Sequence, residues 1–507
     1  MQYAGYTKLI EDLDVLVPPL TRDLATGDSY KDEVLPHGYN DILVLKKTKT
    51  VGPTLCDHIG LAIEMQGIRP AYLYPIFQKI SEDELVAYIS DKPQSTIRRC
   101  IWHLYEWLLD IKLPIADLTS GNYTPLLDDK YYFTSLKGVK DPRTKVIHNM
   151  LGTKEFSPMI RKTSKVKGMI GIDLIDEATE RLRTLHHKVD ADTIGRSIQY
   201  LYTKETKSSF EIENETPDKK RNSRFYQALQ TSGTLPLSKK RLLHLQNQIV
   251  EGKKIDADYR DVEIHVGNVI ADKHEGLLNI VDFIGPIHER VPSLMNGLIE
   301  THRKILTEND LPPIMHAALI AFGFVYIHPF NDGNGRIHRF LFHDILRCRS
   351  DKNEIIIPVS ATILQNINQY YDVLNSFSKP LMALLSDYDI DDETYELRVP
   401  QDLHYLYRYL DLTEHVEFLF DMMTTSIHND LVDEAIFILK FDAVKKAIKS
   451  HVDLPNQKAD LICKFILQNN GTVSGKKRNI PLEYMSEETL TDIEDAVHVI
   501  LMGFNDL

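Results

Sequence analysis

The chain has 507 residues, 43% of them hydrophobic and 26% charged, which suits a globular protein of about three domains. Its net charge of −14 at pH 7 argues against nucleic acid as its main partner. Four scattered cysteines form no C-x-x-C pair, which favours free thiols in a reducing compartment. No apolar run reaches the ~20 residues of a membrane span, so we expect no membrane contact and a cytoplasmic location.

The first 185 residues are predicted to form an accessory region. Apolar residues recur at helical spacing over 82–90 and 96–110, and Pro93 separates these two predicted helices. Residues 111–185 are rich in turns and strand-like pieces. Since no residues in either part have catalytic spacing, we expect a mainly helical region without an active site.

Another helix is predicted within residues 190–214. Its apolar face is marked by Ile194, Ile198, Leu201 and Tyr202. The stretch ends in S-F-E-I-E-N, from Ser209 to Asn214. Ser209 and Glu213 are four residues apart, so they share a face if the helix continues.

Residues 259–267 differ from the helical segments around them. Val262, Ile264 and Val266 alternate with polar residues, and this period of two predicts a strand. Residues 286–327 then predict two helices, because proline follows closely on a possible start at Val291 and again after Asp310.

Residues 328–339, H-P-F-N-D-G-N-G-R-I-H-R, concentrate more chemistry than any other segment. They connect an apolar run at 317–327 to a second predicted helix. Glycines that open a helix allow several N–H groups to converge on an anion. Arg336 and Arg339 share the first turn of that helix, and arginine is suited to phosphate. Asp332 suits Mg²⁺ shared with phosphates, and His328 can act as a base near neutral pH.

Taken singly, a histidine, aspartate or arginine near a turn more often has a structural role than a catalytic one. The segment N-D-G-N-G is a strong turn signal, and His338 occupies the third glycine position of a dinucleotide fingerprint, which makes that interpretation poor. In this order, however, the residues closely resemble H-x-F-x-D-G-N-G-R-x-x-R, the motif of the Fic family of nucleotidyl transferases. The usual reaction of that family transfers AMP from ATP to a hydroxyl group of a target protein.

The resemblance implies a role for each motif residue. His328 would be the general base that accepts the proton of a Ser, Thr or Tyr hydroxyl. Phe330 would anchor the loop in the core, and Asp332 would hold Mg²⁺.

The resemblance also implies how ATP is bound. The anion hole over the α- and β-phosphates would consist of Gly333, Asn334 and Gly335. Arg336 would hold the phosphate tail and Arg339 the γ-phosphate. Tyr371, in a Y-Y-x-x-L segment, would pack near the adenine, although Ser378 replaces an asparagine common in the family.

Two upstream segments gain a role from the same resemblance. Ser209, Glu213 and Asn214 fit the inhibitory pattern S/T-x-x-x-E-G/N, in a helix expected over about 203–214, as in the subclass with a built-in upstream inhibitor. Glu213 would pair with Arg339 and prevent productive ATP binding. A β-hairpin flap, expected over about 260–270 with Ile264, His265 and Val266, would hold the target in register by adding a strand.

The sequence therefore predicts a mainly α fold in three parts. These are an accessory region at 1–185, a Fic-type helical core with a small hairpin flap at 186–385, and a helical region at 386–507. In the last part, the basic stretch 475–479 after a helix hints at a winged-helix fold. Other transfers on the same fold, namely phosphorylation or removal of AMP, stay open. So do a nucleotide-binding regulator whose C-terminal region binds DNA, self-modification and a homodimer.

Overall fold

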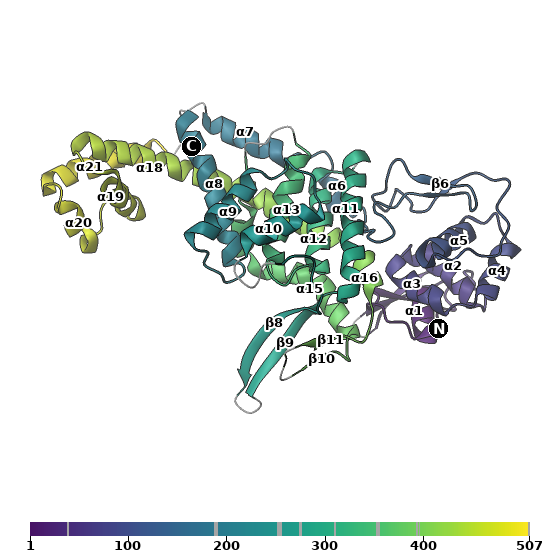
Figure 1. The fold of residues 1–507 in the computed structure, drawn as a ribbon. Coiled ribbons are helices and arrows are strands. Elements are labelled where there is room, and N and C mark those ends of the chain that lie inside the picture. Colours follow the sequence, from purple (N-terminus) through teal and green to yellow (C-terminus); the bar gives the residue numbers. More distant parts are fainter. Residues whose placement is uncertain are drawn as a thin grey trace. The chain divides into compact units, whose positions relative to one another are not determined.

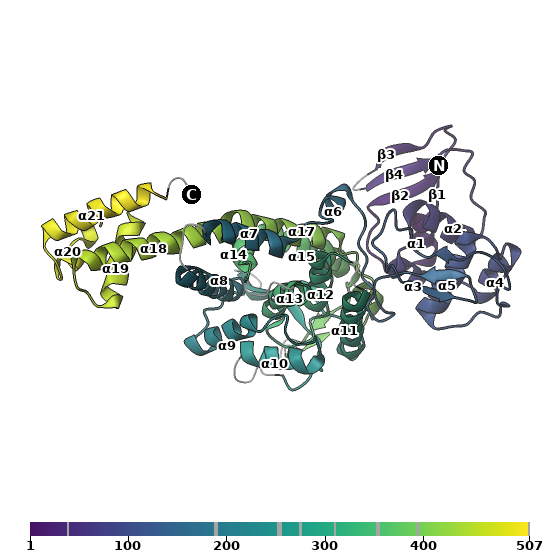
Figure 2. The same ribbon diagram turned by 90° about the horizontal axis from the view of Figure 1, so that it is seen from above.

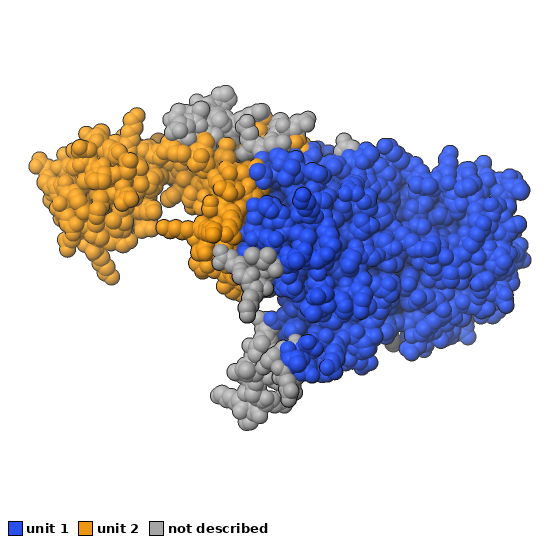
Figure 3. All heavy atoms as spheres, in the orientation of Figure 1, with its two compact units in different colours: residues 1–172, 231–349, 367–420 blue, residues 173–230, 350–366, 421–507 orange. Residues whose placement is uncertain are grey.

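The structure is a computed structural model that describes residues 1–37, 40–186, 191–250, 256–272, 276–308, 311–350, 355–391, 394 and 396–504. Helices dominate the described part, as the mainly α prediction expects (Figure 1). None of the helices found there is long and apolar enough to cross a membrane. The chain divides into two compact units, each built from separate stretches of sequence (Figure 3). The boundaries of these two units differ from those of the three predicted regions, 1–185, 186–385 and 386–507. The three regions therefore remain a prediction.

Unit 1 comprises residues 1–172, 231–349 and 367–420. Its first part contains α1 (Gly5–Leu13), α2 (Leu55–Gln66), α3 (Pro70–Lys79), α4 (Glu82–Asp91), α5 (Thr96–Leu109) and α6 (Ser164–Gly168). Helices α4 and α5 confirm the two helices predicted at 82–90 and 96–110. Ser81 caps α4 through a hydrogen bond from the Glu84 N–H, which explains where that helix starts.

The sequence predicts strand-like pieces over 111–185, where the second of two small sheets forms, but it does not predict the first sheet. The strands β1 (Gln2–Tyr3), β2 (Arg22–Thr26), β3 (Glu33–His37) and β4 (Asn40–Leu45) form one sheet in the order β1-β2-β4-β3 (Figure 2). Leu24, Leu45 and Leu61 join this sheet to α2 in one apolar cluster. A second sheet, in the order β5-β7-β6, consists of β5 (Thr124–Pro125), β6 (Val139–Asp141) and β7 (Val146–His148).

The remainder of unit 1 carries the motif. Its helices are α10 (Lys239–Ile249), α11 (Val291–Glu308), α12 (Pro313–Ile327), α13 (Asn334–Cys348), α15 (Ile367–Leu384), α16 (His404–Arg408) and α17 (Thr413–Thr425), the last of which runs past the end of the unit. Its strands are β8 (His265–Asp272), β9 (Gly276–Ile284), β10 (Asp389–Ile390) and β11 (Leu397–Arg398), and a 3₁₀ turn, η2 (His288–Arg290), precedes α11. Helices α11 and α12 confirm the prediction for 286–327.

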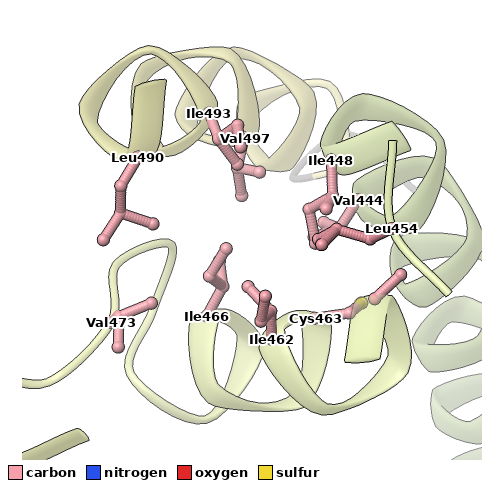
Figure 4. Packing of buried hydrophobic residues seen from close by; sticks show 11 residues of the cluster. Val444, Ile448, Leu454, Ile462, Cys463, Ile466, Val473, Leu490, Ile493 and Val497 are labelled. Atoms are coloured by element: carbon pink, nitrogen blue, oxygen red, sulfur yellow. The ribbon is translucent and has the colours of Figure 1, made fainter. Parts of the chain in front are cut away.

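Unit 2 comprises residues 173–230, 350–366 and 421–507. It contains α7 (Leu174–His186), α8 (Ala191–Glu211), α9 (Lys219–Gln230), α14 (Val359–Gln365), the π-helical turn η3 (Ser426–Asp430), α18 (Leu431–His451), α19 (Asn456–Gln468), η4 (Gly475–Lys477), α20 (Asn479–Leu482) and α21 (Glu487–Met502). Ile462 and Ile466 of α19 face Ile493 and Val497 of α21 in an apolar core (Figure 4).

The winged-helix interpretation of the C-terminal region is wrong in its main feature. The basic stretch 475–479, which would form the β wing, folds as η4 and the start of α20. Residues 431–504, all of which are described, contain no strand. Pro481 lies in the first turn of α20, where a helix needs no N–H donor, whereas a strand in a β wing would need one.

Candidate active site

The site begins where α12 ends. Every residue from Ile314 to Ile327 is buried, so this helix is a core element on all its faces. His328 ends the helix in the left-handed conformation, with φ of 50°, and its N–H donates to the Phe324 carbonyl at 3.0 Å. This conformation costs a non-glycine residue about 1–2 kcal/mol, and such strain is common at functional positions.

A second hydrogen bond defines the protonation of the His328 ring. Its Nδ1 lies 3.0 Å from the Val325 carbonyl oxygen. Because a carbonyl only accepts, Nδ1 must carry the proton, and Nε2 of the neutral ring then carries the lone pair. The ring of Phe283 lies 6.1 Å from the imidazole, centre to centre. The half-buried His328 therefore has the tautomer that a general base needs at Nε2.

The loop after His328 is shaped by its own polar side chains. Asn334 Oδ1 accepts from the Phe330 N–H at 3.1 Å, and Asn334 Nδ2 donates to the Phe330 carbonyl at 2.7 Å. Asn334 is 2% exposed, so its side chain clamps the loop from inside. Gly333, with φ of 89°, precedes α13 in the left-handed conformation that glycine favours. Gly335 is already helical, so one of the two predicted special glycines has ordinary geometry.

The structure brings the charged motif residues together at the start of α13. Arg336 Nη2 lies 2.8 Å from Asp332 Oδ1, and the Gly333 N–H donates to the same oxygen at 2.6 Å. Arg336 and Arg339 are 2% and 0% exposed. In any helix, the N–H groups of the first turn point out along the axis, and here they add to the positive charge of two arginines. The start of α13 is therefore suited to a polyanion.

Two residues that sequence reasoning missed support this loop. Asp256 accepts two hydrogen bonds from Asn331, one from its N–H at 3.0 Å and one from Nδ2 at 2.7 Å. Gln246 donates through Nε2 to Asp256 at 3.1 Å and to the Asp332 carbonyl at 3.3 Å. The buried glutamine interrupts the apolar face of α10, which also contains Leu242, Leu245 and Ile249. A polar residue in that stripe was the available sequence signal.

The hairpin occurs later in the chain than predicted. Strands β8 and β9 pair antiparallel from His265↔Ile284 to Asp272↔Gly276 (Figure 1). The expected range of 260–270 therefore covers most of the first strand and none of the second. Of the three flap residues predicted, His265 and Val266 lie in β8, while the Ile264 carbonyl closes the base by accepting from the Gly285 N–H at 3.1 Å. Val266 is 44% exposed.

Tyr371 and its neighbour differ in burial. Tyr371 is 47% exposed on α15, whereas Tyr370 is 4% exposed and stacks on the buried His338 ring. Burial lowers the pKa of His338 to about 3, so this ring is neutral at physiological pH. The assignment of Tyr371 to adenine stays a prediction.

In unit 2, α8 ends in a local motif that fits the predicted inhibitory pattern. Asn214 is left-handed, with φ of 55°, and its N–H donates to the Glu211 carbonyl at 3.0 Å. The Glu215 N–H reaches back to the Phe210 carbonyl at 3.1 Å. These two bonds form a Schellman cap, in which glycine or asparagine is the usual left-handed residue. Glu213 is exposed in the turn that follows Glu211, and Ser209 is buried.

Comparisons with known proteins agree with the motif. Residues 236–346 match the model of the Fic/DOC family. Over 83 residues the chain is 36% identical to Protein adenylyltransferase Fic of Drosophila grimshawi, with 16% of each chain covered. The protein of the same name from Nematostella vectensis is 36% identical over 98 residues, which is 19% of this chain and 21% of that one.

A solved structure is also similar, a Fic domain containing signaling protein from Bacteroides thetaiotaomicron. It has 16% sequence identity and a TM-score of 0.34, with 52% of this chain and 96% of that chain covered. The chain spans about a fifth or less of the length of the curated relatives that it matches. Residues 236–346 are a Fic domain.

Proposed function

We propose that this protein transfers AMP from ATP to a hydroxyl group of a protein. One observation carries the proposal: the Nδ1–H of His328 is fixed on the Val325 carbonyl beside a loop whose left-handed glycine opens α13. This arrangement combines a base and an anion site within one short loop. The names of the relatives, adenylyltransferases over the matched segment, support the same reaction.

The proposed step is an in-line displacement at the α-phosphorus of ATP. The hydroxyl oxygen of the target forms a bond to that phosphorus, and the bond to the bridging oxygen of the β-phosphate breaks. The hydroxyl proton passes to His328 Nε2, and pyrophosphate leaves with the electron pair. Positioning and neutralisation of charge supply most of the acceleration in reactions of this kind.

Arg336, Arg339 and the glycine turn would bind the phosphates. Arginine donates parallel hydrogen bonds to phosphate oxygens, and these bonds are strong in a buried site. Backbone N–H groups of Asn334 and Gly335 would complete the anion hole, and that of Gly333 would join them by exchanging its hydrogen bond to Asp332 for one to phosphate.

The residues also fit a magnesium ion. Mg²⁺ is usually bound through one or two carboxylates plus substrate phosphates. Asp332 is the carboxylate at the start of α13, where it lies beside the glycine turn and 2.8 Å from the Arg336 guanidinium. When bound, the ion would neutralise phosphate charge, and Asp332 would hold it.

The acceptor would dock on the hairpin. Its Ser, Thr or Tyr would lie in an extended segment that adds a strand to β8 or β9 near His265 and Val266. The same chemistry allows the chain to modify itself. A homodimer is compatible with the proposal but is not required by it.

Inhibition by the end of α8 belongs to the same proposal. Glu213 would pair with Arg339 and occupy the guanidinium that must hold the γ-phosphate. The Schellman cap supports this role, because it gives Glu213 a defined place after the last turn of α8.

The test uses ATP labelled at the α- or the γ-phosphate, incubated with the Glu213→Gly variant and cell lysate. We expect protein-bound label from the α-phosphate alone and a matching gain of one AMP mass. Label from the γ-phosphate would instead indicate phosphorylation, and loss of AMP from a pre-modified protein would indicate removal.

The His328→Ala substitution should abolish transfer and leave ATP binding intact, because proton removal and phosphate binding use different residues. His244→Ala is a matched control, since His244 is exposed on α10 of the same unit. Transfer that survives in His328→Ala would contradict the role of the base.

A further inference from the structure

A buried arginine that has no part in the motif contacts the catalytic loop. Arg260 is 3% exposed, and its guanidinium donates through Nε to the His328 carbonyl at 2.8 Å. Its own N–H donates to the Pro329 carbonyl at 2.9 Å. Two hydrogen bonds from one residue therefore hold the point at which α12 becomes the loop.

The other two arms of the same guanidinium bind the two feet of the hairpin. Nη1 donates to the Val262 carbonyl at 2.8 Å, just before β8, and Nη2 donates to the Pro286 carbonyl, just after β9. Gly285 permits this approach, because a Cβ there would lie 2.9 Å from Nη2. The planar guanidinium thus links three backbone segments rigidly, which the single ammonium of lysine would not do.

The charge of Arg260 is stabilised by three backbone carbonyl groups and by the carboxylate of Glu263. The nearest described carboxylate paired with it, that of Glu263, lies 3.6 Å from Nη1. Burial lowers the pKa of Arg260 to about 10, which still leaves it protonated at neutral pH. The transfer of a charged guanidinium from water into the protein interior costs free energy. A positioning role would explain why a buried arginine is present here despite that cost.

The hairpin also contacts His328 through a side chain, the ring of Phe283. Phe283, near the end of β9, pairs with Val266 and lies with its ring 6.1 Å from the imidazole. The histidine is therefore held on its backbone by Arg260 and beside its ring by Phe283. Both contacts lead directly to the hairpin.

We infer that Arg260 is a positioning residue that sets the register between the His328 imidazole and a hydroxyl group docked on the β8–β9 hairpin. This inference rests on the proposed function. The hydroxyl must lie within hydrogen-bond reach of Nε2 and in line with the α-phosphorus, and a misplacement of about 1 Å can cost about 100-fold in rate. Because one guanidinium binds both feet of the hairpin and the loop, it fixes that spacing.

The experiment compares Arg260→Lys and Arg260→Gln with the unsubstituted chain, all carrying Glu213→Gly. Each is given ATP labelled at the α-phosphate, and AMP bound to protein is counted separately from AMP released to water. We expect protein-bound AMP to fall by about 10- to 100-fold in both variants, with ATP affinity unchanged. Release to water should fall less, since water needs no docking register.

Arg99→Lys is the matched control. Arg99 is also buried and also donates to backbone carbonyls, those of Asn122 and Lys145, in a part of unit 1 that does not include the motif. We expect this variant to keep both products. Thermal unfolding of all variants separates lost positioning from a smaller folded fraction.

Several results would overturn the inference. If Arg260→Lys restores transfer to protein, charge alone suffices, and if both products fall equally, the role is merely structural. If neither Arg260 variant folds, Glu263→Gln loosens the same guanidinium, and an unchanged ratio of the two products would then reject the role. Absence of any AMP product from the Glu213→Gly chain itself would reject the proposed function, and the inference with it.

Discussion

The start of α13 and the end of α8 both use one left-handed residue to turn the chain, but they stabilise the turn differently. At α13, Gly333 is followed by a buried Asn334 that clamps Phe330, and Asp256 binds the loop from 75 residues away. At α8, the turn at Asn214 is closed by backbone hydrogen bonds within six residues. The first turn therefore depends on a partner far away in the sequence and should be rigid. The backbone hydrogen bonds that close the second turn lie within one short segment, which suits regulation.

The largest expected difference between the two regions is their response to acid. The core around the motif buries four histidines whose pKa burial lowers: His302 to about 4, His338 and His415 to about 3, and His316. None of the buried polar residues described in unit 2 is a histidine. The unfolded chain binds these protons near pH 6.5, so stability is present above that pH and is lost as the pH falls below it. Between pH 7 and pH 5, His302, His338 and His415 should each remove about 2 kcal/mol, and His316 acts in the same direction.

Tryptophan fluorescence can measure this loss for unit 1 alone. Both tryptophans, Trp102 and Trp107, lie in α5 of that unit. A Phe465→Trp substitution adds a reporter in unit 2, where Phe465 packs against the C-terminal core. Denaturant midpoints that shift equally for both reporters would contradict the prediction.

Gly333→Ala should have the next largest effect. At φ of 89° an alanine is strained, and its Cβ would lie 3.1 Å from the Val250 side chain. Because the loop is held on several sides, relief of this strain must displace the anion site, and we expect transfer of AMP to fall about 100-fold.

Gly171→Ala is the control for backbone strain. Its φ is 85°, and no atom lies within 4 Å of the added Cβ. Both variants should lose similar stability, about 1–2 kcal/mol, in thermal or chemical unfolding. Equal transfer by the two variants would show that the loop tolerates displacement.

Glu213→Gly tests the regulatory end of α8. If Glu213 competes with the γ-phosphate for Arg339, its removal should raise self-modification about tenfold, within the usual range of coupling between sites. Glu211→Gly removes another exposed glutamate from the same helix end and should leave the level unchanged. Labelled ATP and the purified chain suffice, and an unchanged level in Glu213→Gly would reject inhibition.

The parts that the sequence predicts well are those encoded within a few residues. The motif, α4, α5, α11 and α12 all carry their spacing and their boundary signals locally. The hairpin begins later than the alternating segment predicts, because the carbonyl of Val262 in that segment binds the Arg260 guanidinium and not a neighbouring strand. The predicted β wing at 475–479 does not form, because Pro481 just after it is compatible with the first turn of a helix and not with a strand ladder.

Short sequence patterns do not predict contacts between residues that are far apart in the chain. Asp256 and Asn331 are separated by 75 residues, and nothing in either segment indicates that they meet. The four-stranded sheet near the N-terminus consists of strands of two to six residues, too short for a clear alternation. Tertiary packing decides both features.

Substitutions of Asn214 should have the smallest effect on stability and self-modification. They test how far the backbone turn after α8 itself maintains inhibition. Asn214→Gly keeps the left-handed turn, so stability should change by no more than about 0.5 kcal/mol and inhibition should persist. Asn214→Ala disfavours that conformation and should release self-modification by about two- to threefold, because Glu213 loses its defined place. Labelling of the two variants side by side measures their self-modification. If Asn214→Gly modifies itself as much as Asn214→Ala does, the asparagine side chain, and not the turn, maintains inhibition.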